Sequence, residues 1–215
     1  RLTWSPDAVL AASILNRNKP SRIRDATLTP IDLERVGNRA LSGDKTAWFG
    51  MGTWHDLAYL PRGDLRLFGV DYRVGKTCLI VGAGNQDAAI PSNSPAVPVR
   101  GKAKSLVFLH ALSVSNPGVA PRTFGHYRVT YASGQKEDVA ISSRNATHWL
   151  SETPRNNGWG SWTYSYLWDA TLAWEGCMKA GEAVNLQAYE WVNPRPNDRI
   201  ATVELIAQPG SPGLR

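Results

Sequence analysis

The sequence of 215 residues contains little cysteine and no long apolar run. With only 2 cysteines, the chain cannot rely on the disulfide framework that holds small secreted domains together. No apolar stretch approaches the ~18–20 residues of a membrane-spanning helix, and no basic-then-apolar signal peptide begins the chain. A chain of this length buries about 70% of its unfolded surface, so its core requires no structural metal. These absences predict a soluble globular protein without a membrane partner.

The motifs of several enzyme and cofactor-binding classes are also missing. The chain has no G-x-S-x-G, H-E-x-x-H or C-x-x-C pattern and no calcium loop of alternating aspartates. Two glycine-containing stretches fail as nucleotide-binding loops: residues 69–77 have one residue too many between their glycines, and residues 82–87 lack a third glycine. We interpret both as turns. The four histidines are scattered, which is typical of packed or surface side chains rather than of metal ligands.

The formal net charge of +6 raises the question of nucleic-acid binding. Residues 1–24 contribute +4 of this charge, and the remaining 191 residues carry 19 basic and 17 acidic side chains. No later segment shows a dense stripe of lysine and arginine. The sequence therefore does not predict a nucleic-acid partner.

From about Ile31 onward the chain has the pattern of short strands joined by turns. Apolar runs predict strands at 64–70, 78–81, 105–112, 126–131, 137–141, 183–191 and 200–206. Residues 105–112 are apolar on both faces, which predicts a central strand. The turn Ala132-Ser-Gly-Gln predicts a hairpin, and Asn193-Pro-Arg-Pro predicts a rigid connection between two core strands. This series of strands without helical spacing between them predicts an all-β fold, an antiparallel β-sandwich.

The first residues have a different pattern. Ser5-Pro-Asp offers an N-cap, a proline at the first helical position and a carboxylate for the positive end of the helix dipole. Apolar residues follow at helical spacing from Val9 to Ile14. We therefore expect a short N-terminal helix and linker over residues 1–28, and one β-sandwich domain over residues 29–210.

Tryptophan is frequent and unevenly placed, since six of the nine tryptophans fall between Trp149 and Trp191. In the stretch 156–169, small and flexible residues surround aromatic rings that alternate along the chain and would share one face of an extended segment. Flat rings with polar tips suit the C–H faces of sugars, and asparagine and arginine suit the hydroxyls. The alternative is that these rings are core, which we favour for Trp168 and Trp174.

The two cysteines leave two interpretations open. Cys78 and Cys177 form a disulfide in an exported protein, or they are two buried thiols.

Several stretches carry a further signal. They are Pro30-Ile-Asp-Leu with Asn38, Trp48 through Asp56-Leu57, Leu60-Pro-Arg-Gly, Leu67-Phe-Gly-Val-Asp-Tyr, Gly75-Lys-Thr-Cys-Leu-Ile-Val, Val97 through Ala111, Gly125-His-Tyr-Arg-Val-Thr-Tyr-Ala-Ser-Gly and Tyr189-Glu-Trp-Val-Asn-Pro-Arg-Pro. The most specific are Leu106-Val-Phe-Leu-His-Ala and Trp191-Val-Asn-Pro-Arg-Pro. Together, over roughly residues 29–207, they resemble a family of β-sandwich accessory domains found in bacterial glycoside hydrolases and other polysaccharide-degrading enzymes.

The resemblance implies a galactose-binding-like jelly roll that binds carbohydrate without catalysis or packs against a catalytic module. Sandwiches of this type often hold a structural Ca²⁺, for which the sequence has no diagnostic ligand run. The family supplies no catalytic residues, and the aromatic stretch is not part of the shared pattern. Binding by that stretch would be specific to this protein.

The favoured hypothesis is a secreted, periplasmic or cell-surface module that binds a polysaccharide or glycan without turning it over. The residues expected to stack on sugar rings or to bind hydroxyls are Trp54, Trp159, Trp162, Tyr164, Tyr166, Arg155, Asn156 and Asn157. Two alternatives remain open. One is a small jelly-roll glycoside hydrolase or polysaccharide lyase that uses a carboxylate pair or a cluster such as His148 with Tyr164. The other is a structural module that packs on an upstream catalytic domain.

Overall fold

The computed structural model describes residues 28–42, 56–67, 69–82, 90–113, 122–146, 169–178, 181 and 183–209. Within these ranges every regular element is a β-strand, and all pairings between strands are antiparallel. The all-β class predicted from the sequence is confirmed. The predicted N-terminal helix falls on residues 1–27, which lie outside the described residues.

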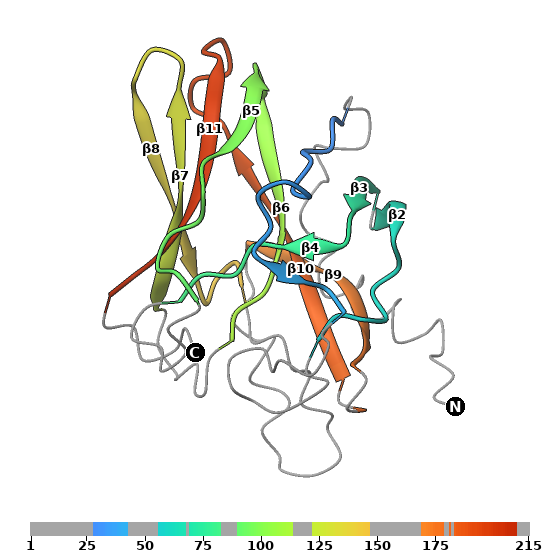
Figure 1. Ribbon diagram of the computed structural model, residues 1–215. Helices are drawn as coiled ribbons and strands as arrows, with labels where there is room; N and C mark the ends of the chain where they lie inside the picture. Colours follow the sequence, from blue (N-terminus) through green and yellow to red (C-terminus); the bar gives the residue numbers. More distant parts are fainter. Residues whose placement is uncertain are drawn as a thin grey trace.

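Eleven strands form four sheets in the described part of the chain (Figure 1). The strands are β1 (Arg39–Ala40), β2 (Gly63–Leu67), β3 (Val70–Val74), β4 (Thr77–Cys78), β5 (Val97–Gly101), β6 (Ser105–His110), β7 (Thr123–Tyr131), β8 (Lys136–Ser142), β9 (Ala170–Cys177), β10 (Ala183–Val192) and β11 (Ile200–Ala207). The sheets have the strand orders β5-β11-β7-β8, β6-β10-β9, β2-β3 and β1-β4.

The four-stranded sheet contains the hairpin that the sequence predicts. β7 and β8 pair along their length, and the N–H of Tyr131 donates to the carbonyl of Gln135 at 2.9 Å to close the turn. Gly134 in this turn has a φ of 87°, a left-handed conformation that glycine adopts without steric cost. β5 was not among the predicted strands, and it contains Pro98. The structure accommodates this proline because β5 is an edge strand, where a missing N–H needs no partner.

The three-stranded sheet corrects one prediction. β6 was expected to be central, but β10 is the central strand, and β6 lies at the sheet edge within the described residues. The physical reason is that both faces of β6 are covered. Leu106 and Phe108 belong to the core on one side of the sheet, whereas Leu109 and Ala111 pack into the core on the other side. A strand covered on both faces is apolar throughout, whether or not both of its edges are paired.

The segment 64–70, predicted as one strand, reverses direction instead. β2 ends at Leu67 and β3 begins at Val70, and the two strands pair with each other. Gly69 between them has a φ of 82°, which a tight reversal requires. Leu67 and Val70 are register partners on the same face, so the inward-facing positions change from odd to even numbers at the turn, a phase shift that marks the reversal. The predicted strand 78–81 is also shorter than expected, since β4 ends at residue 78.

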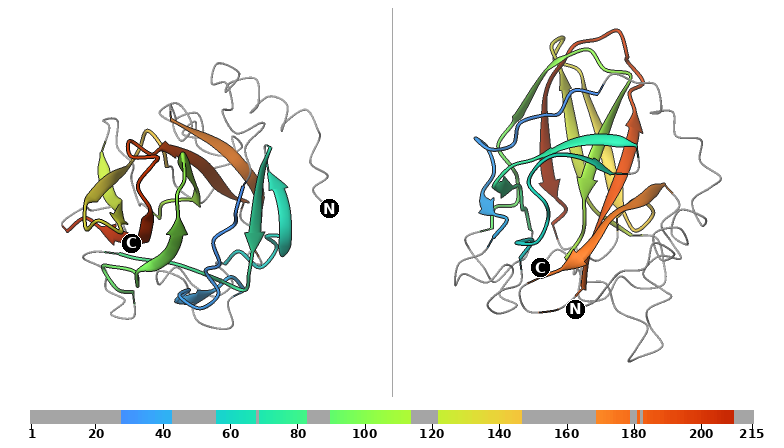
Figure 2. Two further views of the ribbon diagram at one scale, coloured as in Figure 1. Left: turned by 90° about the horizontal axis from the view of Figure 1, so that it is seen from above. Right: turned by 90° about the vertical axis from the view of Figure 1, so that its right-hand side faces the viewer.

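Two core clusters lie on opposite faces of the three-stranded sheet. The first, toward the four-stranded sheet, includes Leu106, Leu112, Phe124, Tyr127, Val129, Tyr131, Val139, Ile141, Ile200 and Val203. The second, toward the two small sheets, includes Leu41, Leu57, Leu60, Val74, Ile80, Ile90, Met178, Val184 and Leu186. Figure 2 shows the corresponding arrangement from above, with the four-stranded sheet and the pair β2-β3 on opposite sides of the orange strands of the three-stranded sheet. No helix in the described ranges is long and apolar enough to span a membrane.

The turn between β10 and β11 connects the two larger sheets and is held by one buried side chain. The carboxamide oxygen of Asn193 accepts hydrogen bonds from the hydroxyl of Tyr131 (2.5 Å) and from the N–H of Arg195 (2.9 Å). Its amide nitrogen donates to the carbonyl of Ala103 (2.8 Å), and its backbone N–H donates to the carbonyl of Lys104 (2.9 Å). The rigid connection predicted between two core strands is confirmed, and Asn193 provides its long-range contacts.

Candidate functional site

The residues on which the carbohydrate-binding hypothesis depends lie outside the described residues. They are Trp54, Arg155, Asn156, Asn157, Trp159, Trp162, Tyr164 and Tyr166, together with His148 and Trp168. Trp174 is described, and its ring packs against the second core cluster, as predicted. The structure also describes the residues from which the aromatic segment 147–168 departs and to which it returns.

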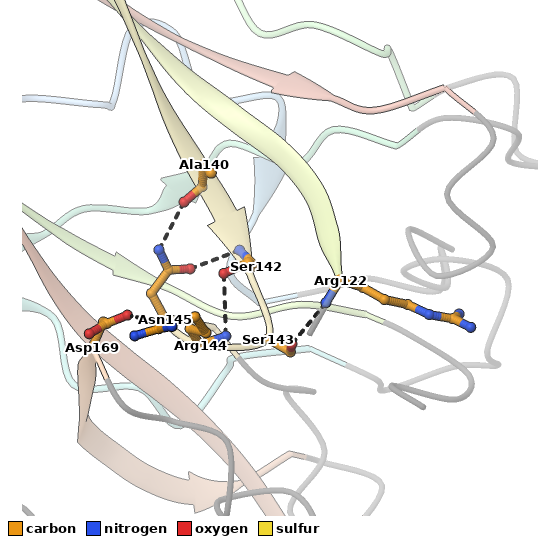
Figure 3. A network of polar contacts seen from close by, with 7 residues as sticks. All are labelled: Arg122, Ala140, Ser142, Ser143, Arg144, Asn145 and Asp169. Carbon is orange, nitrogen blue, oxygen red and sulfur yellow. Dashed lines mark hydrogen bonds and ion pairs between the residues drawn. The ribbon is translucent and has the colours of Figure 1, made fainter. Parts of the chain in front are cut away.

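The two ends of the aromatic segment meet at Arg144 and Asp169 (Figure 3). The Nε of Arg144 donates to the Oδ2 of Asp169 at 2.9 Å, and the N–H of Asp169 donates to the carbonyl of Arg144 at 2.9 Å. Arg144 follows β8, an edge strand of the four-stranded sheet, and Asp169 precedes β9, an edge strand of the three-stranded sheet. The aromatic segment is therefore anchored where these two sheet edges meet.

A tight turn beside Asn145 fixes the Arg144 end of this anchor. The Oδ1 of Asn145 accepts from the N–H of Ser142 (2.9 Å), and its Nδ2 donates to the carbonyl of Ala140 (2.8 Å). The Oγ of Ser143 accepts from the N–H of Arg122 at 3.1 Å, which ties the turn to the start of β7 (Figure 3). Asparagine suits such a turn because its short amide reaches nearby backbone groups.

His110 connects the same turn to the core. Its Nε2 lies 2.8 Å from the carbonyl oxygen of Asn145, which can only accept, so Nε2 carries the proton. Nδ1 then accepts a hydrogen bond from the hydroxyl of Tyr127 at 2.7 Å. Burial lowers the pKa of His110 to about 4 and raises that of Tyr127. Both side chains are thus held neutral, and His110 is a packed histidine, one of the two possibilities that the scattered histidines suggest.

Aromatic rings surround this pair. Phe108 stacks on Tyr127 with ring centroids 3.8 Å apart, and Tyr189 lies 6.1 Å from the ring of His110 and nearly parallel to it. These rings come from β6, β7 and β10, so the stack joins the two larger sheets. It is part of the first core cluster, which assigns it to holding the fold together.

A cavity of about 1470 Å³ lies against the opposite edges of the two larger sheets. Its walls include residues of β5 and β6, the pair β2-β3 and the segment 28–34. The hydroxyl of Tyr72, on its wall, is buried and has no hydrogen-bond partner among the described residues, and burial raises its pKa. Aliphatic side chains make up much of the remaining wall. Charged residues of both signs also border the cavity: Arg73, Arg100, Lys102, Lys104, Asp32, Glu34, Asp64 and Asp71.

The cysteines do not form a disulfide: Cys78 and Cys177 are both free thiols. Burial raises the pKa of Cys78 to about 12, so its thiol is not a nucleophile near neutral pH. Within the described ranges, no three histidine, cysteine, aspartate or glutamate side chains are grouped so that they could hold a metal ion.

Comparisons of the chain with protein families, with curated proteins and with solved structures gave no match. The resemblance to accessory domains of polysaccharide-degrading enzymes therefore stays a prediction from the sequence.

Two groups of polar residues escaped the sequence analysis. Asn185 and Gln187 on β10 are fully buried, and their side chains hydrogen-bond to each other. Their burial could not be foreseen, because both sit at the polar positions of an alternating strand. The sequence does show three cations within residues 100–104. The net charge of a longer segment hides them, because acidic residues elsewhere in that segment offset them in the sum. The structure adds Arg199 to this group.

Proposed function

We propose that the chain is a non-catalytic carbohydrate-binding module of a polysaccharide-degrading system, whose two larger sheets form a jelly-roll β-sandwich. The supporting observation is the anchor formed by Arg144 and Asp169 at the two ends of the aromatic segment 147–168. Trp159 and Trp162, with Tyr164, are the proposed stacking residues. A protein of this kind acts outside the cell or at its surface, where its polysaccharide ligand is found.

The anchor supports the proposal through the cost of ordering a loop on binding. A segment whose ends are already held together loses less conformational freedom when it contacts a ligand, and the ordering of each immobilised side chain costs about 0.5–1.5 kcal/mol. Arg144 and Asp169 are joined both through their backbones and through their side chains. The segment between them is thereby tied to two sheets at one place.

The environment of His110 supports a role without catalysis. A general acid or base needs a ring nitrogen that faces the substrate and a pKa near the working pH. Both nitrogens of His110 are occupied by Tyr127 and Asn145, and burial lowers its pKa to about 4. This histidine–tyrosine pair therefore stabilises the fold.

The proposal is tested by affinity electrophoresis of the purified chain against a panel of neutral polysaccharides. Trp159→Ala and Trp162→Ala are each expected to weaken binding about tenfold or more, since stacking on a ring is worth about 1–3 kcal/mol, while the melting temperature stays unchanged. Trp174→Ala is the matched control, because this ring packs in the core and its loss lowers the melting temperature.

Two results would contradict the proposal. If Trp159→Ala and Trp162→Ala unfold the domain as Trp174→Ala does, the aromatic segment is core. If the chain releases reducing ends or unsaturated products from any polysaccharide of the panel, it is an enzyme.

The anchor itself offers a smaller test. Arg144→Gln is expected to weaken polysaccharide binding about threefold and to change the free energy of unfolding by less than about 1 kcal/mol, as for an exposed ion pair. The control is Arg128→Gln, which removes the ion pair with Asp138 on the β7–β8 hairpin and is expected to leave binding unchanged. Equal effects of the two substitutions on binding would show that the anchor has no special role.

A further inference from the structure

Four exposed cations gather at the end of the four-stranded sheet opposite the Arg144–Asp169 anchor. Arg100, Lys102 and Lys104 lie in and after β5, and Arg199 directly precedes β11. The guanidinium of Arg199 donates to the carbonyl of Arg100 at 3.1 Å. We call these four residues the basic corner. They come from two segments about 100 residues apart, which the pairing of β5 with β11 brings together (Figure 1).

The basic corner carries positive charge that no ion pair with a described carboxylate neutralises. None of its four side chains forms an ion pair within the described residues. Two carboxylates of the neighbouring turns, Asp198 and Glu137, are instead engaged by Arg195, at 3.7 and 3.4 Å.

The backbone beneath these cations is held firmly. The carbonyls of Ala103 and Lys104 accept hydrogen bonds from Asn193, a residue only 3% exposed. Ala103 packs against the first core cluster. Lys102 and Lys104, which flank Ala103 in the chain, are both exposed. Their ammonium groups therefore project from a fixed backbone.

Arg100 occupies a backbone position that suits glycine better. Its φ is 56°, and it is the non-glycine residue with positive φ in the described part of the chain. It lies at a register shift where β5 has one residue more than β11, a bulge whose left-handed position is commonly glycine. An arginine in this conformation costs about 1 kcal/mol relative to glycine. Strain of this kind is characteristic of residues whose side chains serve a function.

We propose that the basic corner binds the carboxylate or sulfate groups of an acidic polysaccharide. This inference rests on the proposed carbohydrate function for the class of polymer, and it adds that the ligand is anionic. Arginine and lysine donate charge-assisted hydrogen bonds to such groups. Sites for single-stranded nucleic acid combine cations with exposed aromatic rings. Among the described residues the exposed aromatic side chain is Tyr59, which belongs to neither segment of the basic corner, so the corner favours the acidic polysaccharide.

The experiment measures binding of the full chain to two matched pairs of polymers: polygalacturonate with its methyl-esterified form, and dextran sulfate with dextran. The triple variant Lys102→Gln, Lys104→Gln, Arg199→Gln is expected to weaken binding to an anionic polymer about tenfold, from about 0.5 kcal/mol for each exposed contact. Raising the salt from about 0.05 M to about 0.5 M weakens the wild type similarly, because the Debye length shortens. The control triple, Arg62→Gln, Arg66→Gln, Arg73→Gln, removes the same charge near and within β2-β3 and is expected to change affinity less than about twofold.

The substitution Arg100→Gly tests whether Arg100 contributes to binding or only to the stability of the fold. Because glycine relieves the strain at this position, the variant is expected to raise the melting temperature by about 2 °C while it weakens binding about threefold. A purely structural arginine would not give opposite changes in stability and binding.

The inference is overturned if the chain prefers neither anionic polymer over its neutral form, if both triples weaken binding equally, or if an oligonucleotide binds more tightly than either polysaccharide. Its failure can be told from failure of the proposed function. Neutral-glycan binding that depends on Trp159 and Trp162, without any preference for anionic polymers, refutes this inference alone. Binding of anionic polymers that depends on the basic corner but not on the tryptophans supports this inference and refutes the proposed aromatic site.

Discussion

Two buried asparagines hold opposite ends of the four-stranded sheet, and they do so over very different distances along the chain. Asn145 is 5% exposed and Asn193 is 3% exposed. Two hydrogen bonds of the Asn145 side chain reach backbone groups three and five residues away, and the same side chain also meets the hydroxyl of Tyr189 on β10. That of Asn193 reaches Ala103 and Tyr131, 90 and 62 residues away. The two sites are separated by the length of β11, about 25 Å at about 3.3 Å per residue.

The difference shows two ways of supporting a functional surface. At the Asn193 end, one side chain joins three segments, and the basic corner projects from the backbone that it holds. At the Asn145 end, the asparagine mainly shapes a local turn, and several groups share the long-range contacts: Tyr189 at the Asn145 side chain, His110 through its ring and Asp169 through its ion pair with Arg144. Loss of one side chain should therefore be more harmful at the Asn193 end.

Asn193→Ala is the strongest test of this contrast. It leaves the hydroxyl of Tyr131, the carbonyl of Ala103 and the N–H of Arg195 without their partner, and each unsatisfied buried group costs about 1–3 kcal/mol. We expect the free energy of unfolding to fall by about 4 kcal/mol, measured by denaturant titration. Tyr131→Phe is the matched control and should cost only about 1 kcal/mol, because the Oδ1 of Asn193 keeps its bond to Arg195. A loss below about 1 kcal/mol in Asn193→Ala would falsify the view that this residue holds the corner.

Acid should weaken the contacts at the Asn145 end of the four-stranded sheet, because His110 bonds to the carbonyl of Asn145. Burial lowers the pKa of His110 to about 4 in the folded chain, against about 6.5 when unfolded, so the unfolded state binds the extra proton first as the pH falls. Stability is therefore complete above about pH 6.5 and is lost between pH 6.5 and about 4. The expected loss is about 3 kcal/mol, read from denaturant titrations across this range.

His110→Gln is the control for this pH dependence, since it should abolish most of the slope between pH 6.5 and 4. The carboxylates of Asp64 and Asp138, whose pKa values are lowered by Arg73 and Arg128, lose their contribution only at lower pH. Tyr127, the ring partner of His110, has a raised pKa and stays protonated throughout. An unchanged slope in His110→Gln would assign the effect to other groups.

Asn145→Ala should have the smallest of the three effects. It removes two hydrogen bonds to backbone groups of the same turn, and its own carbonyl still accepts from His110. We expect a loss of about 1–2 kcal/mol in the free energy of unfolding, within the range of a lost cap or turn contact. A larger loss than in Asn193→Ala, measured under the same conditions, would reverse the comparison.

The sequence anticipated features that depend on near neighbours. The hairpin around Gly134 and the turn at Asn193 were located, because glycine, proline and asparagine impose local backbone geometry. The reversal at Gly69 was missed, although the apolar positions change phase there, from Leu65 and Leu67 to Val70 and Tyr72. β5 was not predicted either, and its Pro98 is compatible with a strand because β5 lies at a sheet edge among the described strands. The predicted aromatic site lies outside the described residues, so the structure tests only the anchor at its ends.

By itself, the sequence determined that this protein is an antiparallel all-β protein, because period-two alternation and turn residues are properties of short stretches. Only the tertiary structure decided that β6 lies at an edge, that His110 and Tyr127 are partners, and that Arg199 joins the cations of residues 100–104. The physical reason is that the alternation of neighbouring residues shows which face of a strand is buried. The register between distant strands, in contrast, depends on the packing of the whole chain. The basic corner exists because β11 pairs with β5, a pairing that no local pattern specifies.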